Sequence, residues 1–294
     1  MPSSIRIKTI NHVGIPIWDR RVALPFYRDI LGLQVIPSMV DSPNIVWTRT
    51  LDGTMVHLIE PADGENLGRP HVAFEVEDFD STVESVQNSG YPDITKAGER
   101  HDGQRHIFAT DNDGNRLEFA TAGGHRPSSR VADSLGYTSE TGENVVVDSP
   151  STIKIITINH VGLPVNDRAE CMLMYRDLLN LGVIPHQVDG NSLAWTEMAD
   201  GSMIHVIDPP KSIGPRGDSR QHVAFEVANI EATADALDEA GVEIVGEPGT
   251  RHDGQQFLFI YDPDGNRIEI ATRGDHSETT RMADENGYTS ENGV

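Results

Sequence analysis

The sequence predicts an α+β protein made of four βαβββ modules in two tandem repeats, with each pair of modules closing around a cavity. First, the chain repeats itself: RHDGQRHIFATDNDGNRLEFAT, residues 100–121, returns as RHDGQQFLFIYDPDGNRIEIAT, residues 251–272. Second, apolar residues within each repeat recur with the period of a strand, then of a helix, then of three strands. This order occurs twice per repeat, so the chain contains four modules.

The repeats align over most of their length. Residues 7–20 return at 155–168, an offset of 148, and the offset becomes 151 after a three-residue insertion in the Pro- and Gly-rich stretch that follows Pro209. Even the tails correspond, because RVADSLGYTSETGE is answered by RMADENGYTSENG. We therefore predict two domains, 1–145 and 146–294, each with two modules and a tail, joined by a linker at about 146–152.

The elements of the first repeat follow from local patterns. An alternating strand, NHVGIPI, precedes an amphipathic helix that Asp19 can cap and Gly32 can end. Asp52-Gly53 is a hairpin signal between the third and fourth strands, and Gly90 ends the second helix. The predicted strands are 11–17, 33–40, 44–52, 54–61, 71–78, 94–100, 104–111 and 115–122, and the predicted helices are 20–32 and 79–90.

Composition excludes several classes of function. The formal charge of -23 argues against nucleic acid or an anionic membrane as a partner, since both need clustered Lys and Arg. A single cysteine, Cys171, excludes an intramolecular disulfide framework. The first residues, MPSSIRIKTINHVG, have no apolar stretch of signal-peptide length, and no run reaches the length of a membrane span. We expect a cytoplasmic protein.

The histidines are distributed in a pattern that points to a site. Of twelve, ten form pairs at the repeat offset. Alternation places His12, His57, His71 and Glu118 on four different strands, each facing away from the apolar side that the helix covers. If two modules close edge to edge, these four side chains line one cavity. Their counterparts in the second repeat are His160, His205, His222 and Glu269.

Two neutral imidazoles and one carboxylate that leave coordination positions open are typical of non-haem Fe(II) sites that react with oxygen. The same ligands also suit Mn, Co, Ni or Zn. A histidine satisfied within the core would explain any one of these residues alone. Repetition of the whole set on matching strand faces favours a metal site, with Fe(II) as the expected ion.

These residues and modules resemble the vicinal oxygen chelate superfamily. Its members include glyoxalase I, methylmalonyl-CoA epimerase, fosfomycin-resistance proteins, bleomycin-binding proteins and the type I extradiol ring-cleaving dioxygenases. The resemblance covers nearly the whole of both repeats apart from the tails. It implies that the metal ligands are His12, His71 and Glu118 in the first repeat, and His160, His222 and Glu269 in the second.

Within the superfamily, the stretch from His252 to Glu269 resembles the extradiol dioxygenases. They have a histidine, an apolar strand with a tyrosine, a turn like DPDGN and then the ligand glutamate. The resemblance implies that His101 and His252 help to bind substrate and oxygen-derived intermediates. It also implies that His57 and His205, about fifteen residues before the second ligand, are the acid-base histidines.

Two features depart from the extradiol pattern. Phe108 and Phe259 stand where the signature has tyrosine, and Tyr261 is expected to face the opposite side of its strand. Familiar two-domain extradiol enzymes usually keep the metal only in the C-terminal half, whereas both halves retain the ligand set here. Tyr137 and Tyr288 in the tails are candidates to replace the missing hydroxyl, and Trp47 and Trp195 are candidates to wall the pocket.

The leading hypothesis is an extradiol-type dioxygenase that opens the ring of a catechol- or hydroquinone-like substrate with Fe(II) and O2. In the alternative, His57 and His205 are fourth metal ligands, as Glu or Gln is in glyoxalase I, and the enzyme is an oxygen-independent lyase or isomerase. A third class is a binding protein without catalysis. The sequence leaves a homo-oligomer open.

Overall fold

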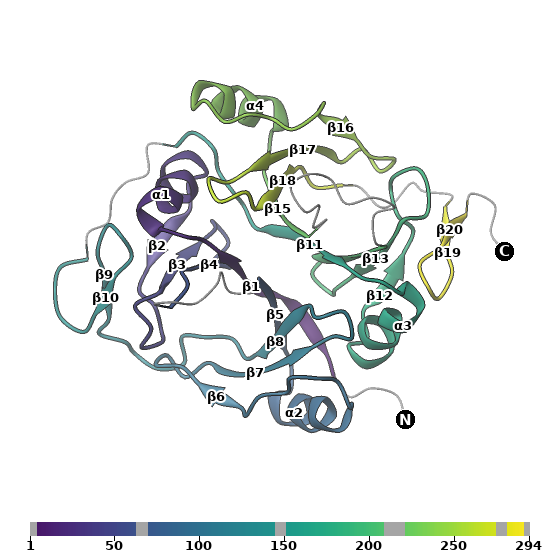
Figure 1. Ribbon diagram of the computed structural model, residues 1–294, viewed down its shortest axis with the longest axis horizontal. Helices are drawn as coiled ribbons and strands as arrows, with labels where there is room; N and C mark the ends of the chain where they lie inside the picture. The colour runs from purple at the N-terminus through teal and green to yellow at the C-terminus, as the bar shows by residue number, and fades with distance from the viewer. Residues whose placement is uncertain (1–4, 63–69, 145–150, 209–220, 275–280, 291–294) are drawn as a thin grey trace.

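The computed structural model describes residues 5–62, 70–144, 151–208, 221–274 and 281–290. The insertion predicted after Pro209 and the predicted boundary between residues 145 and 146 lie outside these ranges. The boundary therefore stays a prediction, whereas the two repeats themselves are seen as two similar sheets (Figure 1).

Each half of the chain forms one curled sheet of eight strands. In the first half their order is β2-β3-β4-β1-β5-β8-β7-β6, and in the second it is β12-β13-β14-β11-β15-β18-β17-β16. The first sheet consists of β1 (Ile7–Pro16), β2 (Gln34–Ile36), β3 (Ile45–Arg49), β4 (Met55–Ile59), β5 (His71–Val76), β6 (Gly98–Glu99), β7 (Arg105–Thr110) and β8 (Arg116–Ala120). The second consists of β11 (Ile158–Pro164), β12 (Gly182–Ile184), β13 (Leu193–Glu197), β14 (Met203–Ile207), β15 (His222–Glu226), β16 (Gly249–Thr250), β17 (Gln256–Tyr261) and β18 (Arg267–Ala271).

The two modules of each half join through their first strands. In the first half, β1 pairs in parallel with β4 of its own module and antiparallel with β5 of the next. Strand β5 then pairs in parallel with β8. The second half repeats these pairings with β11, β14, β15 and β18. The predicted fold of paired βαβββ modules is confirmed.

The helices begin where the sequence predicts. They are α1 (Arg20–Pro25), α2 (Phe79–Asn88), α3 (Arg168–Met172) and α4 (Ile230–Glu239). Asp19 accepts a 2.8 Å hydrogen bond from the backbone N–H of Arg21 and so caps α1, as predicted. Gly32 has the positive φ of 81° that this helix end requires. Within the described residues, no helix has the length and apolar character needed to cross a membrane.

The helix predicted over residues 20–32 is present over most of that range, but it is not α-helical throughout. The α-helix ends at Pro25 and continues as a π-helix, η1 (Phe26–Ile30); its counterpart in the second half is η2 (Leu173–Leu178). Pro25 lacks a backbone N–H, but η2 contains no proline, so the wider turn does not depend on one. Both π-helices carry a fully buried tyrosine, Tyr27 and Tyr175.

The tails form small hairpins rather than unpaired surface segments. Strands β9 (Val131–Ala132) and β10 (Thr138–Ser139) pair with each other, as do β19 (Met282–Ala283) and β20 (Thr289–Ser290). Thr138 Oγ1 accepts a 2.8 Å hydrogen bond from the backbone N–H of Ser38, just beyond β2. The hairpin therefore lies beside the edge strand of the sheet, which a protein must protect from pairing with other chains.

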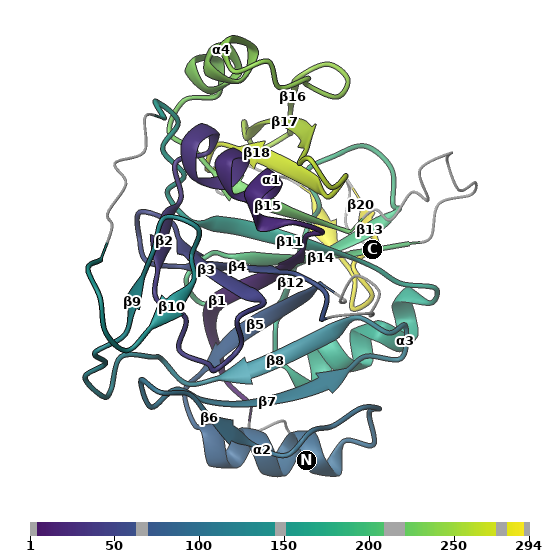
Figure 2. The ribbon, with the colours of Figure 1, turned by 60° about the vertical axis from the view of Figure 1, so that its left-hand side comes forward.

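The DNDGN and DPDGN turns hold the two halves together. Each turn contacts the first helix and first strand of the other half, so α1 lies beside β18 and α3 beside β8 (Figures 1 and 2). Tyr27 Oη donates a 2.7 Å hydrogen bond to Asp262, and Asn266 Nδ2 donates one of 2.8 Å to the Pro16 carbonyl. The symmetric pair joins Tyr175 to Asp111 at 2.9 Å and Asn115 to Pro164 at 2.9 Å. These four bonds position the first strands, which carry His12 and His160.

Removal of one Tyr hydroxyl is expected to loosen this contact. Tyr27→Phe removes the donor that the other half supplies to the buried Asp262, which keeps only its bonds from Asp264 and Asn266 in its own turn, and we expect the free energy of unfolding to fall by about 1 to 2 kcal/mol. Urea unfolding of the metal-free protein measures the change. Tyr137→Phe is the matched control, because this ring is 46% exposed. Equal stability of the two variants would contradict the role assigned to the bond.

Candidate metal centre

One row of side chains crosses the concave face of each sheet. The strand register places Trp47 opposite His57, His57 opposite Gly14, and Gly14 opposite His71. Because alternate residues share a face, His12 projects on the same side as Gly14, and Glu118 on β8 completes the row. The structure thus brings together the four residues that alternation assigns to the cavity.

Three of these side chains meet at one buried point. His12 Nε2 lies 3.1 Å from Glu118 Oε2 and 3.2 Å from His71 Nε2, and the last two atoms are 3.7 Å apart. His12 and Glu118 are fully buried. Burial lowers the pKa of His12 and lowers that of His71 to about 3, so both rings are neutral at pH 7.

A hydrogen-bond chain fixes the tautomer of His12. Asn11 Oδ1 lies 2.9 Å from His12 Nδ1 and accepts a 3.2 Å bond from Gln104 Nε2, while Asn11 Nδ2 donates to Glu75. An amide oxygen can only accept, so His12 Nδ1 carries the proton and Nε2 carries a lone pair. That lone pair points at a carboxylate and at a second imidazole nitrogen.

Arg100 holds the other edge of the carboxylate. Its Nη1 donates to Glu118 Oε1 at 2.8 Å and its Nη2 to Oε2 at 3.2 Å, and Gln104 also accepts from this guanidinium. Although burial alone would raise the pKa of the Glu118 carboxyl, the Arg100 guanidinium helps to hold it below its ordinary value. Glu118 is therefore an ionised carboxylate with a fixed orientation.

Gly14 provides the space for His71. A Cβ atom at this position would lie 2.1 Å from Cε1 and 2.2 Å from Nδ1 of the His71 ring, and Gly162 stands in the same relation to His222. Only glycine at the centre of the first strand lets the ring lie flat against the backbone. This explains the glycine two residues after the first histidine in both repeats.

The rings of His12 and His71 are oriented as two ligands of one ion would be, whereas that of His57 is not. An imidazole binds a metal in its own ring plane, about 2.1 Å from the nitrogen. His12 and His71 have ring planes 87° apart and centroids 5.3 Å apart, which permits both planes to contain one ion at that distance. His57 lies beside His12 with centroids 4.1 Å apart and planes tilted by 31°. Because these planes converge more gradually than planes 87° apart, His57 is less well oriented than His71 to share an ion with His12.

His57 is held by stacking. It lies between His12 and Trp47, whose ring is 3.9 Å from it at 26°. Its Nε2 is buried without a hydrogen-bond partner in the described part of the chain. Burial, assisted by His12, lowers the pKa of His57 well below its ordinary value. The ring is a neutral base with a buried nitrogen next to the cluster.

The second half reproduces this arrangement. His160 Nε2 lies 3.2 Å from His222 Nε2 and 3.3 Å from Glu269 Oε2, and Arg251 Nη1 lies 2.8 Å from Glu269 Oε1. His160 Nδ1 lies 2.9 Å from Asn159 Oδ1. His205 stacks on His160 at 3.9 Å and 28°. Both halves therefore carry the same constellation.

The donor set fits a divalent cation. In each half, two imidazole nitrogens and a carboxylate oxygen converge within 3.7 Å. The lone pair of the first histidine, His12 or His160, faces the carboxylate, and a cation between them would stabilise both. Two His and one carboxylate, with a second set of residues orienting them, match the ligands of first-row transition metals.

A cavity of about 370 Å³ opens onto the second constellation. Its polar lining residues include three charged groups, Arg251, Arg267 and Glu269, beside the histidines. The full lining is Val188, Leu193, Trp195, His205, Ile207, His222, Arg251, Phe259, Arg267 and Glu269. Trp195 lines this cavity, and its counterpart Trp47 stacks on His57 in the first half.

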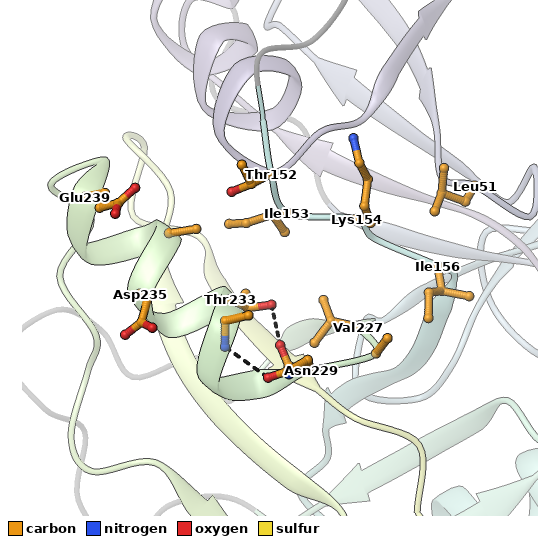
Figure 3. Close-up of a pocket in the computed structure, with 13 residues that line it drawn as sticks. Leu51, Thr152, Ile153, Lys154, Ile156, Val227, Asn229, Thr233, Asp235 and Glu239 are labelled. Atoms are coloured by element: carbon orange, nitrogen blue, oxygen red, sulfur yellow. Dashed lines mark hydrogen bonds between the residues drawn. The ribbon is translucent and has the colours of Figure 1, made fainter.

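A second cavity, of about 540 Å³, lies between α4 and the segment that joins the halves (Figure 3). Its lining combines apolar side chains such as Leu51, Ile153 and Ile156 with Lys154 and Glu239 at its edges. None of its lining residues is a histidine. It offers no set of groups comparable to the constellation, which remains the candidate site.

The structure does not bring the remaining predicted residues into the cluster. His101 Nε2 lies 2.9 Å from Asp41 and its side chain is 41% exposed; His252 Nε2 lies 3.1 Å from Asp189, beside the cavity-lining Val188. Tyr137 and Tyr288 lie on the tail hairpins, where each ring packs on a buried arginine, at 4.0 and 4.3 Å from the guanidinium carbon. Neither tyrosine lines the 370 Å³ cavity.

The expectation that Tyr261 faces the opposite side of its strand is wrong. Tyr261 and Phe259 are two residues apart on β17, and the register pairs them with Arg267 and Glu269, so both lie on the face that carries the cluster. Tyr261 is not among the residues that line the cavity.

Sequence reasoning missed the residues that support the ligands. Asn11, Arg100 and Gln104, with Asn159, Arg251 and Gln255 in the second half, contact the ligands or one another. Their repetition could have identified them, because the three residues of the first half recur unchanged in the second, within the repeated strings INH and RHDGQ.

The family follows from a sequence comparison. Residues 9–119 and 157–270 match the profile of the Glyoxalase/Bleomycin resistance protein/Dioxygenase superfamily. The chain belongs to this superfamily. Among curated proteins, the uncharacterized protein YaeR of Escherichia coli is 27% identical over an alignment of 123 residues that covers 38% of this chain and 95% of YaeR.

Solved structures of several enzymes share the fold. The 2,3-dioxygenase LapB from Pseudomonas sp. KL28 superposes with a TM-score of 0.64 at 18% identity, covering 93% of this chain and 94% of LapB. Homoprotocatechuate 2,3-dioxygenase from Brevibacterium fuscum gives 0.64 at 20%, covering 93% and 82%. The Mn(II)-bound glyoxalase from Novosphingobium aromaticivorans gives 0.62 at 17%, covering 91% and 83%.

Two equivalent constellations predict two metal ions per chain. We expect metal analysis after anaerobic loading to give about two ions, with His12→Ala and His160→Ala each retaining one and the double variant none. His125→Ala, at an exposed position, is the control. A wild-type stoichiometry of one would show that the halves are not equivalent.

The buried neutral His71 predicts that the metal-free protein loses stability in acid. Its pKa is about 3 in the folded chain and about 6.5 in the unfolded chain, so below pH 6.5 only the unfolded chain gains the proton. Between pH 7 and pH 5 this lowers the free energy of unfolding by about 2 kcal/mol. Urea unfolding with chelator present should show a smaller loss for His71→Gln, and an equal loss in both proteins would contradict the assignment.

Proposed function

We propose that the chain is a metal-dependent, extradiol-type ring-cleaving dioxygenase that uses Fe(II) and O2 on a catechol- or hydroquinone-like substrate. The observation that carries the proposal is the arrangement of His57 and His205. Each is a buried histidine next to a two-His, one-carboxylate cluster, and its ring is stacked on the first ligand at 28° to 31° rather than turned edge-on toward a shared ion. A three-ligand site with a separate base is what oxygen-dependent ring cleavage requires.

The ligands would be His12, His71 and Glu118 in one half, and His160, His222 and Glu269 in the other. When bound, Fe(II) would supply Lewis acidity and open positions for two adjacent substrate oxygens and for O2. Asn11 fixes the tautomer of His12, and Arg100 fixes the carboxylate. These residues pre-organise the ligands before metal arrives.

His57 and His205 would act on protons. A neutral imidazole accepts a proton from a substrate hydroxyl held beside the cluster, and the stack with Trp47 or Trp195 keeps the ring in place. The same ring then returns the proton to the ring-opened product. Placement on a rigid strand gives this transfer a fixed geometry.

His101 and His252 are proposed to assist substrate at the mouth of the cavity. His252 follows Arg251, which lines the cavity, and its side chain is 43% exposed and paired with Asp189. A histidine at this position meets the substrate on entry rather than at the cluster. We expect its loss to change KM more than kcat.

One observation favours the second candidate, an oxygen-independent glyoxalase-like lyase or isomerase. The ligand atoms of His12, His57 and His71 all lie within 4.8 Å of one another, as do those of His160, His205 and His222. A rotation of the His57 ring out of its stack would make it a fourth ligand. The two functions therefore differ in the conformation of one side chain.

The His57→Gln/His205→Gln variant separates the two functions. If these histidines are bases, the variant keeps about two Fe(II) per chain and loses oxygen uptake with catechols or hydroquinones by about 10²- to 10⁴-fold. Anaerobic metal analysis and an oxygen electrode measure both quantities. His125→Gln is the control.

Loss of metal from the double variant, with no oxygen uptake by the wild type and tighter binding of Ni, Co or Zn, would favour the four-ligand enzyme and reject the dioxygenase. Retention of full oxygen uptake in the variant would reject His57 and His205 as the acid-base groups.

A further inference from the structure

The cavity of the second half has one positive charge that the cluster does not use. Of the three charged groups in its lining apart from the histidines, Arg251 pairs with Glu269 at 2.8 Å. Arg267 is the third. Within the described part of the chain, no carboxylate lies in ion-pair range of Arg267, although the whole chain has a formal charge of -23. An unpaired cation in the cavity of so acidic a protein indicates an anionic ligand group.

Packing directs Arg267 toward the cavity. Its guanidinium carbon lies 3.9 Å from the centre of the Phe259 ring. The Phe259 ring in turn packs edge-to-face on His222, with ring centroids 5.8 Å apart. Stacking on an aromatic face leaves the in-plane N–H groups of a guanidinium available to a ligand. Phe259 is also the residue that replaces the tyrosine of the extradiol signature. Arg267 therefore stacks on the ring that has no hydroxyl group here.

The first half carries the same arginine on a phenylalanine, with Arg116 at an exposed position. The counterparts of the ten lining residues are identical at nine positions; only Leu193 differs, as Ile45. Arg116 lies over Phe108 with its guanidinium carbon 4.1 Å from the ring centre, and the strand register places it opposite His71. The stack of an arginine on a phenylalanine thus recurs in both repeats.

The position of Arg267 sets where the anionic group lies. Arg267 and Glu269 are two residues apart on β18, on the same face and about 7 Å apart along the strand. That separation is comparable to the length of a benzene ring with a substituent at each end. A substrate whose two oxygens face the cluster would present its opposite end to Arg267.

We propose that the substrate is a dihydroxyaromatic carboxylate, and that Arg116 and Arg267 bind its carboxylate. The inference rests on the proposed function for the placement of the two hydroxyl oxygens at the cluster. Apolar walls from Leu193, Ile207 and Phe259 enclose the ring, and the arginine selects the charged substituent.

A matched pair of ligands tests the proposal without turnover. 3,4-Dihydroxybenzoate and 3,4-dihydroxybenzamide have nearly the same shape but differ by one negative charge. Anaerobic titration calorimetry of the Fe(II)-loaded protein should give the benzoate about ten-fold or more tighter binding than the benzamide. Arg116→Gln/Arg267→Gln should remove that preference and leave the affinity for the benzamide unchanged. Arg21→Gln/Arg105→Gln, which makes the same charge change on surface ion pairs, should retain it.

Equal binding of the two compounds by the wild type, or an undiminished preference in Arg116→Gln/Arg267→Gln, would overturn the inference, as would an equal loss in the control variant.

Oxygen uptake is measured separately. Preferential binding of the benzoate without oxygen uptake would reject the dioxygenase but retain the carboxylate site. Oxygen uptake with uncharged catechols and no preference for the benzoate would retain the dioxygenase but reject the carboxylate site. Failure of both compounds to bind would reject both proposals.

Discussion

The convergence of His12, His71 and Glu118 at one buried point is the constraint on which the rest of the structure depends. A carboxylate with no exposed surface is unfavourable unless its charge is compensated. Arg100 compensates it on one edge and two imidazole nitrogens face the other. Because Asn11 fixes the proton of His12 on Nδ1, the nitrogen that faces the carboxylate cannot donate to it. The sheet thus holds acceptors against one another, an arrangement that a cation at their centre stabilises.

That arrangement explains features far from the cluster. The first strand of each half must hold a histidine and, two residues later, a glycine against which the second histidine packs. The same strand ends at Pro16 or Pro164, whose carbonyl accepts a hydrogen bond from an asparagine of the other half. Each half therefore steadies the strand that carries the other half's first ligand. Fusion of two repeats in one chain gives each site a support that an isolated repeat lacks.

The fold and the cluster could be predicted because both follow from alternation along strands. The residues that support the ligands were not predicted, because they lie where side chains do not alternate regularly between the two faces of a strand. Strand β1 has a register shift between Ile10 and His12, and β11 has one between Ile158 and His160. A bulge of this kind re-aims a side chain, so Asn11 reaches the ring of its neighbour instead of the opposite face. Arg100 precedes β7 in a turn, where period-two reasoning assigns no face. The DPDGN turn could be recognised as a motif, but its contact with the other half depends on tertiary structure.

The orientation of His57 shows what separates two chemistries on one fold. A strand histidine at this position is equally able to bind an ion or to accept a proton, and the sequence around it is compatible with both. In the structure the ring of Trp47 stacks on His57, whose plane is tilted by 31° against that of His12. An aromatic contact is worth about 0.5 to 1.5 kcal/mol, less than a metal–nitrogen bond. Under the proposed function, the stack of Trp47, His57 and His12 would therefore have to act as a whole to keep His57 available as a base, and the same stack recurs in the second half.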